Sequence, residues 1–381
     1  MPKNENICVI GISARAFAQS FVAAGFTVTA IDRFGDTDLQ RIANTELFPN
    51  SADWSAPLAA AGKMPWVAAG GVENRIELIE QFESRHCGPS PSAYRRLRDH
   101  VALLGELSSS GFTTPETRAQ VDCTVLDAKS ARRWLWKPFD SAAGLGIDRV
   151  DAASLRSERR GSWRRGYWQR FVPGDVFSAA YVSDQSGNSQ LLGVCRQFSG
   201  PRWGAPRPFQ FVGGVGPVDI PPAVTRELQR LGDWLTTHIG VCGVWSVDWV
   251  MADRRPCVLE VNPRYAANME LLERALGISI AELHIAGCRG KVDSLQLRSP
   301  PERIGKAVVY ADRPCRIDER LRGVCGRKQN RKLTWIADLP AGGQRLVRGE
   351  PVLTVFAAGP TELTVAERLQ TRRRAVHSCL C

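Results

Sequence analysis

Two acidic residues placed symmetrically about a polar turn constrain this chain more than any other feature. Two apolar runs, residues 243–251 and 257–262, flank a polar turn at 252–256 that is centred near Arg254. The runs predict an antiparallel hairpin. Asp248 lies six residues before the centre and Glu260 six residues after it. The two carboxylates are therefore expected to face each other, with Cβ atoms about 5 Å apart.

The chemistry of this hairpin points to a divalent cation. Strand alternation puts Asn262 on the face of Glu260 and diagonal to Asp248. Two carboxylates this close repel unless a cation or a proton compensates. Oxygen ligands without Cys or His favour Mg²⁺ or Mn²⁺, with phosphate oxygens and water completing the octahedron. Arg264, just beyond the strand, could hold a phosphate or a developing acyl phosphate. The alternative is a surface pair whose symmetry is a coincidence.

A second segment has the pattern of a phosphate-binding loop. A strand ends at Lys137, is stopped by Pro138 and opens into a small-residue loop containing Gly144 and Gly146. Such loops let backbone N–H groups approach phosphate oxygens, and the lysine adds a compact positive charge. The lysine precedes the glycines, so this is not a Walker A loop. Taken alone, an ordinary hairpin loop explains the segment equally well.

A third segment is suited to an adenine ring. A strand leaves an apolar stretch at a Pro-Gly turn, and its last residues are Gln169, Arg170, Phe171 and Val172, with Asp175 after the turn. Backbone groups and one polar side chain beside flat apolar surface match the edge and faces of adenine. Many strands end in this way, so the segment is informative only together with the other two.

The first 90 residues alternate between strands and helices. Strands are predicted at 7–10, 26–31 and 65–69, with helices at 14–24 and 73–82, which indicates a parallel sheet. Gly11 and Asp32 belong to the dinucleotide-binding pattern, but that fingerprint needs three glycines and only Gly11 is present. We therefore expect a structural βαβ unit, or one whose C-terminal edge serves another substrate, and no nicotinamide or flavin site.

The remainder divides at a polar Gly/Pro/Ser stretch, residues 87–92. After it we expect a helix at 93–107, a strand-rich region at 134–261 with loops at 200–208 and 213–217 and a helix at 223–238, a helix at 269–287, and short strands at 307–311, 333–337 and 346–358. The predicted domains are an α/β domain at 1–90, a central domain at 91–298, and a β-rich lobe with a basic tail at 299–381.

Composition sets limits on the class of protein. A chain of 381 residues with 23% charged and 8% aromatic residues is globular, and general disorder, collagen and coiled-coil rods are excluded. No 18 apolar residues run together and the run 7–12 is too short for a signal peptide, so we expect a cytoplasmic protein without a membrane partner. Eleven scattered cysteines without a C-x-x-C pair indicate reduced thiols.

The formal charge of +11 predicts a polyanionic partner, either nucleic acid, acidic lipid or a nucleotide. One arginine cluster is interleaved with aromatic residues, as in proteins that track single strands: Arg156, Arg159, Arg160, Arg164, Arg165 and Arg170 with Trp163, Tyr167 and Trp168. Further basic clusters lie at 313–332 and 372–374. Solvated charged faces are the usual explanation, and we do not expect nucleic acid as the primary partner.

Taken in order, the three segments resemble the ATP-grasp superfamily of carboxylate–amine (or thiol) ligases, over about residues 7–290. The resemblance implies an α/β and α+β ATP-grasp fold with an N-terminal Rossmann-like pre-ATP-grasp domain and a lid at about 125–190. It implies ATP and Mg²⁺ (or Mn²⁺) as cofactors. The implied roles are phosphate contact for Lys137, a lid loop for Gly144 and Gly146, the adenine hinge for Gln169, Arg170, Phe171 and Val172, a ribose contact at a slightly unusual offset for Asp175, metal ligation for Asp248, Glu260 and Asn262, and phosphoryl stabilisation for Arg264.

Two departures from the family pattern are visible. The family's second phosphate-binding lysine has no counterpart in the stretch Arg98-Asp99-His100, where Arg98 or His100 could replace it or the contact could be absent. Ser246 stands where many members have an arginine. The C-terminal runs 336–340 and 348–359 are similar to a biotin-carboxylase-related subgroup, in which tyramine–glutamate ligases of one-carbon cofactor synthesis are the nearest activity.

The implied function is an ATP-dependent carboxylate–amine ligase that forms an amide through an acyl phosphate. Its partners would be a small-molecule carboxylate and amine. No Ser-His-Asp or Cys-His arrangement is visible, which agrees with chemistry that depends on positioning and charge neutralisation. The alternatives are a carboxylase-like enzyme that uses bicarbonate, a basic nucleic-acid-binding protein, and an ATP-binding sensor without turnover.

Overall fold

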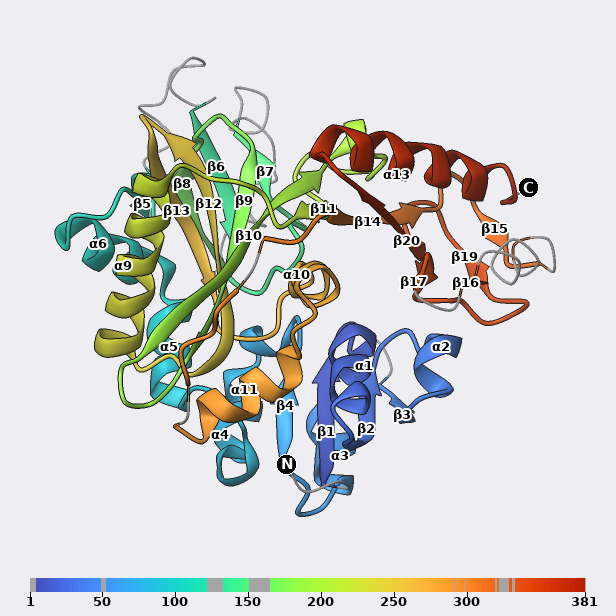
Figure 1. Cartoon of the computed structure of the whole chain (residues 1–381), viewed down its shortest axis with the longest axis horizontal. Coiled ribbons are helices and arrows are strands. Elements are labelled where there is room, and N and C mark those ends of the chain that lie inside the picture. The colour runs from blue at the N-terminus through green and yellow to red at the C-terminus, as the bar shows by residue number, and fades with distance from the viewer. Residues whose placement is uncertain are drawn as a thin grey trace.

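The computed structural model describes residues 5–48, 53–121, 133–150, 165–290, 292–297, 299–318, 321, 329–330 and 333–380. Three larger sheets organise these residues (Figure 1). The first is parallel, with strand order β3-β2-β1-β4. Its elements are β1 (Asn6–Gly11), α1 (Arg15–Ala23), β2 (Thr27–Asp32), α2 (Thr37–Gln40), β3 (Asn44–Leu47), α3 (Ser55–Ala60), β4 (Trp66–Ala68), η1 (Val72–Asn74), α4 (Ile76–Gln81) and η2 (Glu83–Arg85).

This sheet confirms the predicted alternation of parallel strands and helices, but one predicted helix is wrong. The helix predicted over 73–82 is divided into η1 and α4, because Arg75 leaves helical geometry between them. Since the chain passes from β3 on one side of β1 to β4 on the other, the order of connection reverses between β1 and β4. The carboxyl ends of strands at such a reversal form the usual ligand crevice of an open parallel sheet.

A pair of helices leads into a small antiparallel sheet that we call the lid sheet. The helix predicted at 93–107 is two helices, α5 (Pro91–Arg98) and α6 (His100–Ser109), because the Asp99 side chain accepts a hydrogen bond from Ala102 N and caps α6. The lid sheet has the order β5-β8-β6-β7. Its strands are β5 (Thr117–Arg118), β6 (Trp134–Pro138), β7 (Asp148–Arg149) and β8 (Gly166–Arg170).

The largest sheet has eight antiparallel strands in the order β13-β12-β9-β10-β11-β14-β20-β18. Its strands and flanking helices are β9 (Val176–Ser183), β10 (Ser189–Ser199), η4 (Pro201–Trp203), β11 (Phe211–Gly216), α9 (Pro222–Ile239), β12 (Gly243–Ala252), β13 (Arg255–Asn262), α10 (Met269–Leu276), α11 (Ile280–Cys288), β14 (Arg303–Tyr310), β18 (Ile336–Ala337), β20 (Pro351–Gly359) and α13 (Glu362–His377). The helix predicted at 269–287 ends at Gly277, whose φ of 67° terminates α10.

The C-terminal lobe continues this sheet, since β11 pairs with β14 across the predicted boundary near residue 298. Two-stranded pairs, β15 (Cys315–Arg316) with β19 (Arg345–Leu346) and β16 (Gln329–Asn330) with β17 (Leu333–Thr334), complete the lobe. The predicted basic tail is in fact helix α13, which runs beside β14 and β20 (Figure 1). Val365, Leu369 and Val376 of α13 are buried in the core, so apolar packing orders this arginine-rich segment.

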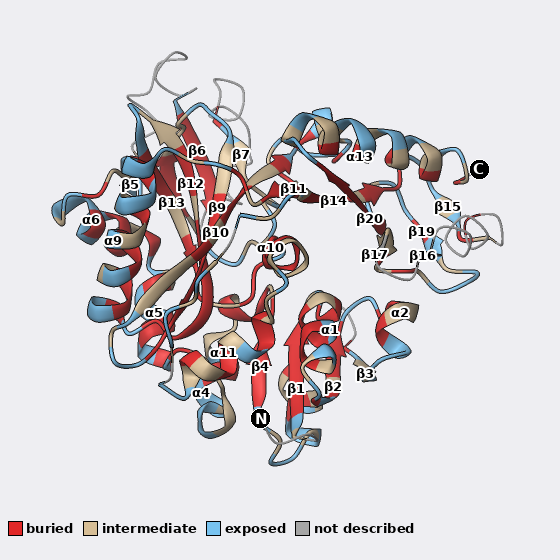
Figure 2. Cartoon of the chain, in the orientation of Figure 1, coloured by how far each residue is buried: buried red, intermediate tan, exposed pale blue. Residues whose placement is uncertain are grey.

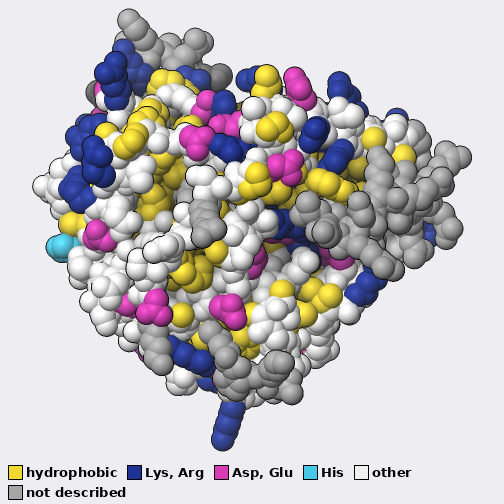
Figure 3. All heavy atoms as spheres, viewed as in Figure 1, with side chains coloured by type: hydrophobic (Ala, Val, Ile, Leu, Met, Phe, Trp, Pro, Cys, Tyr) yellow, Lys and Arg dark blue, Asp and Glu magenta, His cyan; other side chains and the backbone are white. Residues whose placement is uncertain are grey.

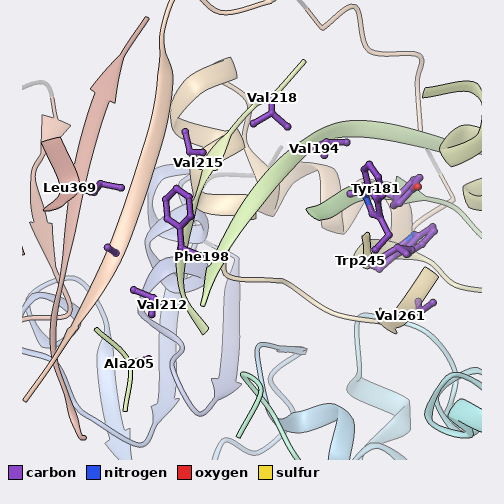
Figure 4. Packing of buried hydrophobic residues seen from close by; sticks show 14 of the residues in the cluster. Tyr181, Val194, Phe198, Ala205, Val212, Val215, Val218, Trp245, Val261 and Leu369 are labelled. Carbon is purple, nitrogen blue, oxygen red and sulfur yellow. The ribbon is translucent and has the colours of Figure 1, made fainter. Parts of the chain in front are cut away.

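Strand alternation divides the core of the large sheet between its two faces. Figure 2 shows buried residues along the strands of this sheet. On one face, Tyr181 of β9 stacks on Trp245 of β12 with ring centroids 4.3 Å apart, and α9 covers them (Figure 4). On the other face, Ala180 and Val244 pack in a cluster that includes α1, α10 and α11. Asp248 lies on this second face, so the candidate site opens toward the N-terminal sheet. In the described part of the chain, no helix is long and apolar enough to span a bilayer.

Candidate active site

The hairpin β12–β13 places Asp248 directly opposite Glu260, as predicted, but the register arises differently. The turn has two residues, Asp253 and Arg254, both at positive φ (48° and 64°), and Ala252 pairs with Arg255. A plain two-residue hairpin would therefore pair Asp248 with residue 259. A β-bulge at residue 259 adds one residue and shifts Glu260 into place.

Amide groups surround the two carboxylates. Gln197 Nε2 donates to Asp248 Oδ1 at 2.6 Å, and Asn262 Nδ2 lies 3.4 Å from Asp248 Oδ2 and 3.5 Å from Glu260 Oε1. Partial burial and the charge of Glu260 raise the pKa of Asp248 to about 7. Burial works against a charged Glu260 as well, but Lys137 and Arg98 outweigh it and lower the pKa of Glu260 to about 2. The carboxylates of Asp248 and Glu260 thus repel each other, and a bound cation would reduce this repulsion.

Lys137 reaches this pair from the lid sheet. Its side chain is 9% exposed, and its ammonium lies 4.0 Å from Glu260 Oε2 and donates to Gln169 Oε1 at 3.0 Å. Burial lowers the pKa of Lys137, but Tyr167 and Glu260 more than compensate and keep it above its usual value, so the lysine is charged. Gln169 Nε2 in turn donates to the carbonyl of bulge residue Leu259 at 3.1 Å. Gln169 therefore connects the lysine to the β12–β13 hairpin.

The glycine loop after β6 is confined on one side by the start of β11. Gly144 has φ of 71°, and a Cβ there would lie 2.0 Å from the Phe209 carbonyl oxygen. Ala143 O accepts a hydrogen bond from Phe211 N at 2.9 Å. Gly146 also has positive φ (75°), and a Cβ there would lie 2.9 Å from the Pro138 ring. Glycine is thus required at both positions, for conformation and for space.

The remaining predicted nucleotide residues lie at the end of β8 and in the turn that leads to β9. Arg170 is bound to Glu116, and the guanidinium of Arg149 lies 4.4 Å from the ring centroid of Phe171. Val172 is half-buried after β8. Asp175 is 60% exposed and paired with Arg196 at 2.6 Å, so the ribose role implied for it would require that pair to open. Most of the predicted basic-aromatic cluster at 156–170, with Arg156 to Arg164 and Trp163, lies outside the described residues.

Arg264 connects the hairpin to the N-terminal sheet. It leaves the end of β13, donates to Asn262 Oδ1 at 3.1 Å, and reaches Glu73 Oε1 at 2.6 Å. Its guanidinium carbon lies 3.9 Å from where a Cβ of Gly70 would be. Gly70 and Glu73 follow β4, at the reversal between β1 and β4. The arginine therefore stands where an open parallel sheet binds ligands.

Glu73 was missing from the sequence-based site. It is 2% exposed, and its second oxygen accepts from Gly71 N at 2.6 Å. Burial raises the pKa of Glu73, but Arg264 outweighs it and holds the pKa below its usual range. The available signal was the Gly70-Gly71 pair directly after a buried parallel strand, where a ligand crevice is expected.

The two candidates for the second phosphate-binding cation differ in character. His100 is buried and stacked on Tyr167 with ring centroids 4.7 Å apart. Burial, with the nearby charge of Arg98, lowers the pKa of His100 to about 3, so it is neutral at physiological pH. The Arg98 guanidinium donates to Asn74 Oδ1 at 2.6 Å and to Phe139 O at 2.8 Å.

The donor set fits Mg²⁺ in chemistry. Two facing carboxylates and one amide supply hard oxygen atoms, and no thiol or imidazole competes with them. As placed, Asn262 directs its nitrogen to the carboxylates and its oxygen to Arg264. An amide flip would present the oxygen instead. Among the described residues, no group of three His, Cys, Asp or Glu side chains is arranged for a metal.

Comparison with known proteins gives a consistent result. Residues 97–268 match the ATP-grasp domain family. The carbamoyl phosphate synthase large chain of Helicobacter pylori is 27% identical over 67 residues, which are 18% of this chain and only 6% of that protein. A formate-dependent phosphoribosylglycinamide formyltransferase of Anaeromyxobacter dehalogenans is 24% identical over 289 residues, covering 70% of this chain and 72% of the relative.

Solved structures extend the likeness to the whole chain. The ADP complex of an N5-carboxyaminoimidazole ribonucleotide synthetase superposes with a TM-score of 0.74, 14% identity and 99% coverage of both chains. The L-amino acid ligase of Bacillus licheniformis has a TM-score of 0.71, 14% identity, and 99% and 98% coverage. These likenesses confirm the fold predicted from the three motifs. Residues 97–268 thus carry an ATP-grasp domain, and the chain as a whole shares the fold of these solved structures.

Proposed function

We propose that this ligase joins a carboxylate to an amine through an acyl-phosphate intermediate. One observation carries the proposal: the hairpin that pairs Asp248 with Glu260 delivers Arg264 from its own end to the ligand crevice of the N-terminal sheet. Arg264, which reaches the crevice, is thus only the fourth residue after Glu260, which belongs to the group suited to bind Mg²⁺ and phosphate. This arrangement supports a transfer between a nucleotide on one side and a carboxylate on the other.

The proposed chemistry assigns separate roles to these residues. When bound, Mg²⁺ held by Asp248, Glu260 and Asn262 would neutralise charge on the phosphate oxygens. Lys137 binds a phosphate as a point charge, and Arg264 stabilises the phosphoryl group as it passes from ATP to the carboxylate oxygen. ADP leaves. The neutral amine then attacks the acyl carbon, and inorganic phosphate departs as the amide forms.

The glycine loop has a protective role in this scheme. An acyl phosphate is hydrolysed by water, so the site has to exclude solvent while both steps occur. The loop at 139–147 is seated against β11 and lies beside Lys137, at the entrance that a nucleotide would use. The lid sheet would carry this loop as one unit with Lys137 and Gln169.

For the substrates we propose an amino acid, with glutamate as the first candidate, in the synthesis of a one-carbon cofactor. Similarity of residues 348–359 to the tail of the tyramine–glutamate ligase subgroup supports this choice, as does the shared fold with an L-amino acid ligase. A bicarbonate-using reaction follows the same first step and is the second candidate. It is supported by the shared fold with the biotin carboxylase of Campylobacter jejuni, at a TM-score of 0.71 and 13% identity over 96% of this chain.

The test is an ADP-release screen with Mg²⁺, in which glutamate and other amino acids are paired with varied amines and products are identified by mass spectrometry. We expect amine-dependent ADP release with a matching amide, and none in Asp248→Asn. Incorporation of labelled bicarbonate without amide would establish the carboxylase-like reaction. Salt-dependent nucleic-acid binding with no turnover on any pair would overturn both.

A further inference from the structure

Asn74, the last residue of η1, uses both ends of its side-chain amide on elements outside the N-terminal sheet. Its Nδ2 donates to the carbonyl of Ser141 at 3.0 Å, and its Oδ1 accepts from Arg98 Nη2 at 2.6 Å. The same Arg98 nitrogen donates to the carbonyl of Phe139 at 2.8 Å. Two carbonyls of the glycine loop are thus held by one asparagine and one arginine.

The two contacts restrain the side of the loop that β11 does not touch. On the β11 side, Gly144 lies against the Phe209 carbonyl and Ala143 accepts from Phe211 N. On the other side, the described contacts to the N-terminal sheet and α5 are those made by Asn74 and Arg98. A short loop with three residues at positive φ, Ala143, Gly144 and Gly146, has few conformations of its own that fit both neighbours.

Asn74 is also adjacent to Glu73, the partner of Arg264. The three residues of η1 therefore touch the glycine loop through Asn74 and the phosphoryl-binding arginine through Glu73. A shift of η1 would move both contacts together, because Glu73 and Asn74 are adjacent residues of the same helical turn. The position of the loop and the position of Arg264 are linked through this turn.

We propose that Asn74 and Arg98 form a latch that holds the glycine loop closed over the nucleotide, and that η1 coordinates this closure with the placement of Arg264. This proposal depends on the proposed function in one respect, which is that the glycine loop covers MgATP. Asn74 is a positioning residue, since it acts on backbone carbonyls of the loop and on Arg98. Loss of the latch leaves the loop open more often, so nucleotide affinity falls and more acyl phosphate is lost to water.

The test is hydrogen–deuterium exchange of peptides covering 139–147 in the full chain, with Mg²⁺ and the non-hydrolysable analogue adenylyl imidodiphosphate. We expect faster exchange in Asn74→Ala than in the wild type, by about 3- to 30-fold for the loss of one or two hydrogen bonds. Asn74→Asp keeps the acceptor for Arg98 but loses the donor to Ser141, so an intermediate effect is expected. Arg95→Ala is the matched control, because exposed Arg95 on α5 pairs with Glu80 and does not touch the loop.

The results of these measurements distinguish loss of the latch from a folding defect, and they distinguish failure of the latch proposal from failure of the proposed ligase reaction. A misfolded variant would exchange faster in β1 and β4 as well, whereas the latch predicts a change confined to the loop. With the correct substrates, ADP release per amide formed should rise in Asn74→Ala. Wild-type exchange over 139–147 in both Asn74 variants would overturn the latch, even if the ligase reaction is found. Failure of every substrate pair would leave the exchange result valid, because it needs only the nucleotide analogue.

Discussion

Arg264 after the β12–β13 hairpin and Glu73 of η1 form an ion pair of 2.6 Å with side chains only 12% and 2% exposed. The pair joins two parts of the chain that are 191 residues apart. It gives the guanidinium a fixed direction, because Asn262 Oδ1 and the Tyr265 carbonyl accept its other hydrogen bonds.

Glu73→Gln should lower the free energy of unfolding by about 3 kcal/mol, because Arg264 loses its buried partner. Since the pKa of Glu73 is lowered in the folded state, its contribution is complete above the unfolded pKa and is lost as pH falls through the folded pKa. Urea unfolding should therefore show the full difference from wild type above about pH 5.5 and a smaller one in acid. Equal stability of the two proteins at pH 7 would contradict the pair's importance.

Asp248→Asn and Glu260→Gln should each reduce ADP release by at least about 100-fold while the fold remains intact. Asp248→Asn also removes the repulsion between the two facing carboxylates, so its melting temperature without metal should not fall. Glu260→Gln removes the carboxylate that Lys137 faces, so its melting temperature without metal should fall. Stabilisation by MgATP in a thermal shift assay should be lost in both variants. Full activity in either variant would exclude the proposed metal site.

Arg98→Met and His100→Phe should have opposite outcomes for nucleotide binding. The Arg98 guanidinium helps to lower the pKa of Glu260, and its loss should raise KM for ATP by about 10-fold or more. His100 is neutral and stacked on Tyr167, so an aromatic replacement keeps its contact and should leave KM nearly unchanged. KM for ATP measured between pH 6 and 8 should show no step from His100. A tenfold effect of His100→Phe would make His100 the phosphate contact.

Glu270→Gln should destabilise the chain by about 3 kcal/mol or more. The Glu270 carboxylate is buried and contacts Arg15 of α1, Arg274 of α10 and Lys306 of β14, at 2.6 to 3.0 Å. Without it, three cations from three elements face one another. Glu282→Gln, at an exposed position of α11, is the control and should change the urea midpoint little. A similar midpoint for both variants would show that the cations find other partners.

Arg254→Gly should stabilise the protein by about 1 kcal/mol without changing activity. Arg254 has φ of 64° in the two-residue turn of the β12–β13 hairpin, a conformation that costs a residue with a Cβ and suits glycine. Arg207→Gly, at an exposed position without positive φ, is the control and should not stabilise. Thermal unfolding of both variants tests the turn, and destabilisation by Arg254→Gly would contradict its geometry.

Local patterns anticipated much of the fold and failed where tertiary contacts decided. Residues 213–217 were predicted as a loop because of their glycines, yet they fall largely within β11, in the middle of the large sheet. A Cβ at Gly213 would lie 2.0 Å from the Lys306 carbonyl, so the glycine is there for close approach of a neighbouring strand. The arginines of residues 372–374 suggested a tail, but the apolar positions of α13 pack on the sheet.

The charge of +11 did not locate the site. Figure 3 shows Lys and Arg side chains gathered at the upper left of this view, over the region of β5, β13 and α9. The site's own cations, Lys137 and Arg264, are mostly buried and paired with acidic or amide groups. Net charge counts exposed and buried groups alike, and a small number of desolvated charges has more effect on a ligand than many solvated ones.

The sequence by itself indicated the hairpin that carries Asp248 and Glu260, because strand period and turn signals are local. It also determined the order of the three nucleotide segments and the parallel N-terminal sheet. Only the tertiary structure decided that a bulge at Leu259 sets the register, that Glu73 holds Arg264, and that Asn74 and Arg98 hold the glycine loop. These contacts join residues far apart in the chain, and no local periodicity encodes which distant surfaces meet when apolar faces are buried.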